Sequence, residues 1–173
     1  MSDTFITIIA IFLAAILMFI FPLMTLADRN DDITELTIQT STTEFVEQIR
    51  KTGKLTLDEY DSFVKKLAAT GNAYDLQLEF QILDEAPGKK DAIGVTTVIG
   101  ENTYYSKFRV QIEETLFRDG VYYLKEGDIV SARVEKTSPS LAETLRGVWY
   151  KLSGNDAATQ VGSSAGTVTT NGR

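Results

Sequence analysis

The sequence predicts an α+β protein: an N-terminal transmembrane helix that continues into a helical stem, then a small three- to four-stranded sheet packed with helices. Residues 4–27 form an apolar run without one charged side chain. Residues 33–71 repeat apolar side chains at helical spacing, and residues 74–82 alternate strictly between apolar and polar side chains, as in a half-buried strand. The expected organisation is a transmembrane helix at 4–27, a helical stem or hairpin at 28–71, an α+β head at 72–154 and a Gly-, Ser- and Thr-rich tail at 155–173.

The apolar run is long enough to cross a membrane. As a helix with a rise of about 1.5 Å per residue it spans roughly 36 Å, against a hydrocarbon core of about 30 Å. A cleaved signal peptide is the alternative, because Thr25 and Ala27 after Pro22 resemble a cleavage region. However, the run is longer than the usual apolar region of about 7–15 residues, and Met1–Asp3 carries no Lys or Arg. We therefore expect a retained membrane helix, with a kink near Pro22 because proline removes a helical hydrogen bond.

The first helix of the stem covers Ile33–Thr52 and can continue the membrane helix directly. Ile38, Phe45 and Ile49 fall close to one of its faces. Gly53 is the expected end, because glycine readily adopts the left-handed conformation that stops a helix.

The second helix of the stem begins at a capping box formed by Thr56 and Glu59. Its expected buried stripe is Leu57, Tyr60, Val64 and Leu67, and Gly71 ends it. Because only a short link separates this helix from the first, the two are expected to form an antiparallel hairpin.

The head contains a second clear strand and one ambiguous segment. Val130, Ala132 and Val134 share one face of the strand expected at 128–136. Residues 103–120 are ambiguous: Phe108, Val110 and Ile112 alternate like a strand, but the segment also presents a helical face, and a helix is favoured because Gly120 offers a C-terminal cap. The helical face consists of Tyr105, Phe108, Ile112 and Leu116. Further candidates are a short strand at 94–100, a helix at 138–154 and an edge strand at 165–172 in the tail.

Composition argues against catalysis and against nucleic-acid binding. The chain has no Cys and no His, which removes thiolate nucleophiles, the commonest general base and the commonest transition-metal ligands. Gly162–Gly166 matches the G-x-S-x-G elbow with Ser164 as nucleophile, but that chemistry requires a histidine base. The net charge of -7 and the lack of a basic patch disfavour nucleic acid. We expect no enzyme activity, no catalytic or cofactor-binding residues, no metal or cofactor, and no small-molecule substrate.

The apolar helix with Pro22, the stretch Phe45–Gln81 and the stretch Tyr122–Asp156 together resemble pilin-like single-pass proteins of tight-adherence (type IV-like) pilus and secretion clusters in Gram-positive bacteria. The resemblance implies a structural subunit or minor component of a surface appendage or secretion apparatus. In such proteins the N-terminal helix anchors the subunit in the membrane and then packs against other copies, while the head faces outward. The implied partners are membrane lipid and copies of the chain itself or other pilin-like subunits.

The resemblance also implies which residues act in anchoring and assembly. They are Phe5, Ile9, Phe12, Ile16, Phe19 and Pro22, with Asp3 nearest to the early acidic residue that pairs with a neighbour's N-terminus. The implied location is an extracytoplasmic C-terminal domain, with the further option of an extracellular filament. Among the residues next to the apolar run, Arg29 on its C-terminal side is the one basic residue. By charge alone it weakly favours a cytoplasmic C-terminus. The alternative function is a membrane-tethered extracytoplasmic binding module that is not part of a filament.

Overall fold

A computed structural model of the chain describes residues 2–84, 104–139 and 160–172. These residues form the predicted α+β fold, with helices and antiparallel sheets of two and four strands. The strand expected at 94–100 and nearly all of the helix expected at 138–154 lie outside the described ranges.

Helix α1 runs from Ser2 to Thr52, so the apolar run and the first stem helix are one helix, as predicted. It ends at Gly53, whose φ of 65° is left-handed and whose N–H bonds the Ile49 carbonyl at 2.8 Å. The chain divides into two compact units: residues 37–137 with 158–173 form one, and helix residues 2–36 belong to the other. From here on, the head means the first of these units, residues 37–137 with 158–173, and not the stretch 72–154 that was expected from the sequence.

Helix α2 runs from Leu57 to Ala68 and carries the predicted capping box between Thr56 and Glu59. The predicted stripe is wrong at one position. Phe63 is buried and stacks on Phe45 of α1, while Val64 is 37% exposed.

The helices α1 and α2 form the predicted antiparallel hairpin within the head. The rings of Phe45 and Phe63 stack with centroids 4.2 Å apart. Lys66, one turn later in α2, lies 3.8 Å from Glu44, one residue earlier in α1. The contact later in α2 is therefore made to the earlier residue of α1, as expected when the two helices run in opposite directions.

A four-stranded antiparallel sheet lies against this hairpin in the order β3-β2-β5-β6. Its strands are β2 (Tyr74–Leu83), β3 (Tyr104–Phe108), β5 (Ile129–Lys136) and β6 (Gln160–Thr167). The strands β2 and β5 confirm the two alternating patterns. The tail does contain an edge strand, β6, but it begins five residues before the stretch 165–172 in which an edge strand was expected. A second, two-stranded sheet pairs β1 (Lys54–Thr56) with β4 (Val121–Tyr123).

The helix favoured over residues 103–120 is wrong in its first part. Residues Tyr104–Phe108 form β3, and only Arg109–Asp119 form a helix, α3. Pairing of β3 with β2 satisfies the backbone of these residues, and such a partner 25 residues away cannot be inferred from local periodicity. The expected C-terminal cap is present, since Gly120 has φ 75°.

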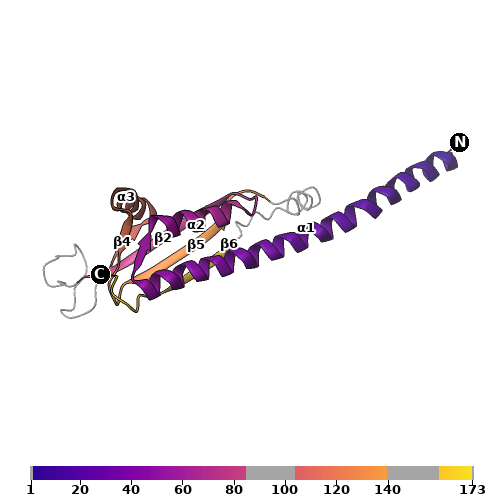
Figure 1. The fold of residues 1–173 in the computed structure, drawn as a ribbon. Helices are drawn as coiled ribbons and strands as arrows, with labels where there is room; N and C mark the ends of the chain where they lie inside the picture. Colours follow the sequence, from indigo (N-terminus) through magenta and orange to yellow (C-terminus); the bar gives the residue numbers. More distant parts are fainter. Residues whose placement is uncertain (1, 85–103, 140–159, 173) are drawn as a thin grey trace, which may run out of the picture. The chain divides into compact units, whose positions relative to one another are not determined.

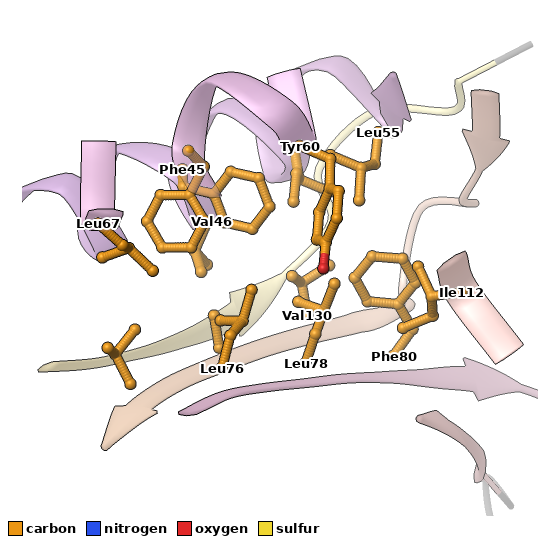
Figure 2. Close-up of a cluster of buried hydrophobic side chains, with 14 of the residues drawn as sticks. Phe45, Val46, Leu55, Tyr60, Leu67, Leu76, Leu78, Phe80, Ile112 and Val130 are labelled. Carbon is orange, nitrogen blue, oxygen red and sulfur yellow. The ribbon is translucent and has the colours of Figure 1, made fainter. Parts of the chain in front are cut away.

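The core lies between the helices and one face of the sheet. Figure 2 shows Phe45, Val46 and Tyr60 pointing from the helices toward Leu76 and Leu78 of β2. The largest fully buried side chains include Ile38, Val46, Ile49, Leu55, Leu78, Phe80, Ile112, Leu116, Val130 and Val134. The apolar face of β2 and the faces of α1 and α3 therefore meet in one core.

Candidate functional site

The candidate site is the apolar part of α1, whose large side chains are exposed. The predicted assembly residues Phe5, Ile9, Phe12, Ile16 and Phe19 are all exposed, from 38% at Ile16 to 71% at Phe19. Ile6 and Ile8 are also exposed, so apolar side chains surround the helix. A helix that is apolar on all sides is normally buried in protein or in lipid.

Hydropathy identifies the same segment. An 18-residue window of α1 has mean hydropathy 2.9, and this helix near the N-terminus is long and apolar enough to cross a membrane. Neighbouring side chains bury none of that window. The segment is therefore a candidate membrane anchor, although a signal sequence has the same properties.

Pro22 is exposed and lies inside α1, which continues through it. Proline has no N–H for the carbonyl four residues earlier. The hydroxyl of Thr25 donates to the Phe21 carbonyl at 3.0 Å, so the backbone near the proline gains one side-chain hydrogen bond. The kink predicted here stays a prediction. Asp3 lies within the bounds of α1, but its side chain is outside the described part of the chain.

Within the head, α1 covers the outer edge of β6. The side-chain amide of Gln39 donates to the Ser163 carbonyl at 3.0 Å and accepts from the Ser163 N–H at 3.0 Å. Farther along, Arg50 Nε donates to the Thr167 carbonyl at 2.8 Å. The helix thus satisfies backbone groups that an edge strand would otherwise leave open to pairing with another chain.

The G-x-S-x-G match is part of this contact. Gly162, Ser164 and Gly166 pair with Val134, Ala132 and Val130, whose side chains are buried, so the three small residues share the face toward α1. A Cβ at Gly162 would lie 3.2 Å from Ile38 and Thr42. A Cβ at Gly166 would lie 2.5 Å from Arg50 Nε. The glycines therefore allow close approach of strand and helix, in a strand rather than in a strand-turn-helix elbow.

The C-terminal segment after β6 fixes the end of α1. The N–H of Thr169 donates to the Arg50 carbonyl at 3.0 Å, and the N–H of Gly172 donates to the Leu124 carbonyl at 3.1 Å. Gly53 and Gly172 approach so closely that a Cβ on either would collide with the backbone of the other segment. These long-range contacts hold the end of α1 and the tail as one structure.

A polar cluster joins α2, α3 and β2. Tyr60 donates a hydrogen bond to Glu113, which also accepts from Arg109 Nε at 2.8 Å. Burial, followed by the bond to Glu113, raises the pKa of Tyr60 to about 12. Burial would raise the pKa of Glu113, but the hydrogen bonds from Tyr60 and Arg109 outweigh it and lower the pKa. Tyr60, Glu113 and Arg109 each have a partner within the cluster, which therefore ties α2 to α3.

The described residues also form one groove that could be considered as a ligand site. An open groove between α1 and α2 is lined by charges of both signs, including the pairs Lys66–Glu44 and Lys51–Glu47, each 3.8 Å apart. Within the described ranges, no three Asp, Glu, His or Cys side chains group as metal ligands.

The protein has no significant match among protein-family models, curated proteins or solved structures. Conclusions about function therefore depend on the sequence and on this geometry.

The sequence identified the apolar helix but not the contacts that attach α1 to β6. Gln39, Ser163 and Arg50 carry no local signal, because the pairs are 124 and 117 residues apart. Gly162 and Gly166, four residues apart in one strand, are the kind of sequence feature that marks close backbone approach.

Proposed function

We propose that this protein is a pilin-like structural subunit or minor component of a bacterial surface appendage or secretion apparatus. Its apolar helix anchors the chain in the membrane and then packs against the same helix of other copies. The head lies on the extracytoplasmic side, and the protein has no catalytic role.

The observation that carries this proposal is the difference between the two parts of α1: one is buried in the head, and the other exposes apolar side chains. Ile38, Val46 and Ile49 are buried in the head core, whereas the large apolar side chains of Phe5, Phe12 and Phe19 are exposed. Burying exposed apolar surface is favourable by about 25 cal/mol per Å², so the segment requires lipid or other helices around it. An assembly rod uses both environments in turn, whereas a simple anchor uses only the first.

The lack of cysteine makes the proposal directly testable. Single-cysteine variants Ile9→Cys and Ile16→Cys of the full chain are oxidised in cells that express it, before and after shearing of surface material. Ser62→Cys, an exposed position of α2, is the control. We expect disulfide-linked oligomers from the α1 variants at several times the control yield, and the protein in the sheared fraction.

Two results decide between the rod and the alternatives. Protein that stays in the membrane, without cross-links through α1, contradicts assembly and favours a tethered binding module. Full protection of the head from protease added to intact protoplasts contradicts an extracytoplasmic location.

A further inference from the structure

The segment that follows β6 contains the one Asn-Gly pair of the sequence, Asn171–Gly172. Asparagine is a thermally labile residue. It is most reactive before glycine, because a glycine has no Cβ to hinder its backbone nitrogen from reaching the asparagine side chain. Asn171 is exposed, so water reaches it. The pair is therefore a candidate for spontaneous deamidation, and the fold decides when the reaction can occur.

Residues 168–172, called the strap from here on, are bonded to distant parts of the head. The N–H of Val168 donates to the Asp128 carbonyl at 2.7 Å. The N–H of Thr169 donates to the Arg50 carbonyl of α1 at 3.0 Å, and the Thr169 hydroxyl donates to the same oxygen at 3.2 Å. The closed strap is thus fixed to the end of α1, and opening it breaks several hydrogen bonds together.

The closed strap also holds the groups that would react. The N–H of Gly172 donates to the Leu124 carbonyl at 3.1 Å. The Asn171 Oδ1 accepts from the Glu126 N–H at 2.8 Å, which fixes the side chain in place. The Gly172 nitrogen must lose its proton and turn toward the Asn171 side chain before it can attack, so the bond to Leu124 has to break first. The closed strap therefore protects the pair.

We propose that Asn171–Gly172 is a spontaneous modification site that reacts when the strap opens. The Gly172 nitrogen forms a bond to the Asn171 Cγ, and the bond between Cγ and Nδ2 breaks. The amide nitrogen leaves as ammonia with the proton from the glycine N–H. Water from the solvent then opens the succinimide ring to give aspartate or isoaspartate, and no oxidant or reductant takes part. The inference does not depend on the proposed function.

Isoaspartate at position 171 prevents the strap from closing again. It leads the backbone through the former side chain and adds one C–C bond of about 1.5 Å to the chain. The closed strap has no room for this: a Cβ on Gly172 would lie 2.0 Å from the Gly53 carbonyl oxygen. A chain whose strap has stayed open long enough therefore permanently loses contacts that hold the end of α1.

Two glycine variants separate opening of the strap from strain at a helix end. Gly53→Ala places a Cβ 2.1 Å from the Thr170 carbonyl oxygen, so the strap must move while the Asn-Gly pair stays unchanged. Gly71→Ala is the matched control. Both glycines follow a helix with positive φ, 65° and 80°, but a Cβ on Gly71 meets no atom of the described residues within 4 Å.

Full-length wild type and both variants are incubated in detergent at mildly alkaline pH, folded or in guanidinium chloride. Circular dichroism checks the fold, and mass spectrometry of peptides follows deamidation at Asn171. We expect folded wild type and folded Gly71→Ala to react at least tenfold more slowly than in denaturant, the factor for an opening free energy of about 1.4 kcal/mol. Folded Gly53→Ala should react at least tenfold faster than folded Gly71→Ala.

Equal rates for folded and denatured wild type would overturn the inference, and so would equal rates for the two folded variants. If Gly53→Ala does not fold, the comparison of folded with denatured wild type decides. Hydrogen exchange of refolded chains tests the block to closure. The strap should exchange at least tenfold faster with isoaspartate than in Asn171→Asp, which has the same charge and a normal backbone. Equal exchange would refute the block.

Discussion

Gln39 of α1 bonds both backbone groups of Ser163 in β6, each at 3.0 Å, so a helix side chain occupies the place of a neighbouring strand. The same helix supplies the exposed apolar segment. The residues that fix α1 within the head therefore also determine how securely an anchor or rod is connected to it.

Gln39→Ala should lower the free energy of unfolding by about 0.5–1.5 kcal/mol, because two backbone groups exchange a protein partner for water. Urea unfolding of the full chain in detergent, followed by circular dichroism, measures this. The control Gln77→Ala removes an amide from the polar sheet face, where it bonds Asp75 and Glu135 at 3.5 and 3.3 Å. An equal cost at the two positions would contradict a special role for the edge contact.

Gly162→Val should cost about 1–3 kcal/mol, because its side chain must displace Ile38 or Thr42. Ala165→Val on the exposed, opposite face of β6 should change stability by less than about 0.5 kcal/mol. Ser164→Ala should also be nearly neutral, as expected of a small packing residue. Unfolding midpoints of the three variants provide the comparison, and a large loss in Ser164→Ala alone would point back to a role for its hydroxyl.

Stability should fall as pH rises from about 10 to about 12, because folded Tyr60 keeps its proton up to a pKa of about 12 while an unfolded tyrosine loses it near 10. This contribution is complete below the unfolded pKa. Tyr60→Phe should remove that part of the pH dependence and cost about 1 kcal/mol at neutral pH. Denaturant unfolding at several alkaline pH values tests this, and an unchanged alkaline slope in Tyr60→Phe would refute it.

The Glu113 carboxylate of the same cluster makes stability depend on pH in the opposite direction, with the loss at acid pH. The pKa of Glu113 is lowered in the fold, so its contribution is present above the unfolded pKa and is lost as pH falls through the folded pKa. In Glu113→Gln, the free energy of unfolding should fall less steeply as the pH is lowered through the folded pKa of Glu113. Above the pKa of an unfolded glutamate, the substitution should not change how stability depends on pH. A wild-type acid limb in that variant would show that other carboxylates dominate.

Asp128→Ala should be among the most destabilising single changes in the head. The Asp128 carboxylate is 2% exposed and accepts from the N–H groups of Leu83 at 2.9 Å and Lys125 at 2.8 Å. Without it two backbone donors lose their partner, at a cost of about 2–4 kcal/mol. Asp119→Ala, at an exposed carboxylate paired with Arg118, should leave the stability almost unchanged, because solvent screens the pair. Similar unfolding midpoints for the two variants would contradict the role assigned to Asp128.

The sequence predicted those parts of the fold that depend on local patterns. The capping box at Thr56, the helix end at Gly53 and the alternation of β2 each require only neighbouring residues, and all are confirmed. Strand β3 could not be predicted, because Tyr104–Phe108 fits a helix and becomes a strand by pairing with β2. Local pattern cannot rank two backbone states that differ by a tertiary partner.

The candidate site divides in the same way. Apolar composition identified the segment from Phe5 to Phe19 without any knowledge of the fold. The helical face predicted from the sequence includes Ile112 and Leu116, and both are buried in the core. The high exposure of Val110 and Phe117, 76% and 66%, could not be read from the sequence, because apolar side chains are typical of buried positions.

The most direct test of the central claim is the N-terminus of the mature protein, determined by intact-mass measurement and N-terminal sequencing of material from membranes and from sheared surface fractions. An anchor that becomes an assembly rod must keep residues 4–27 in both fractions, and that is the result we predict. A mature chain beginning at Asp28 would show that the apolar segment is a cleaved signal peptide, and would contradict both the anchor and the rod.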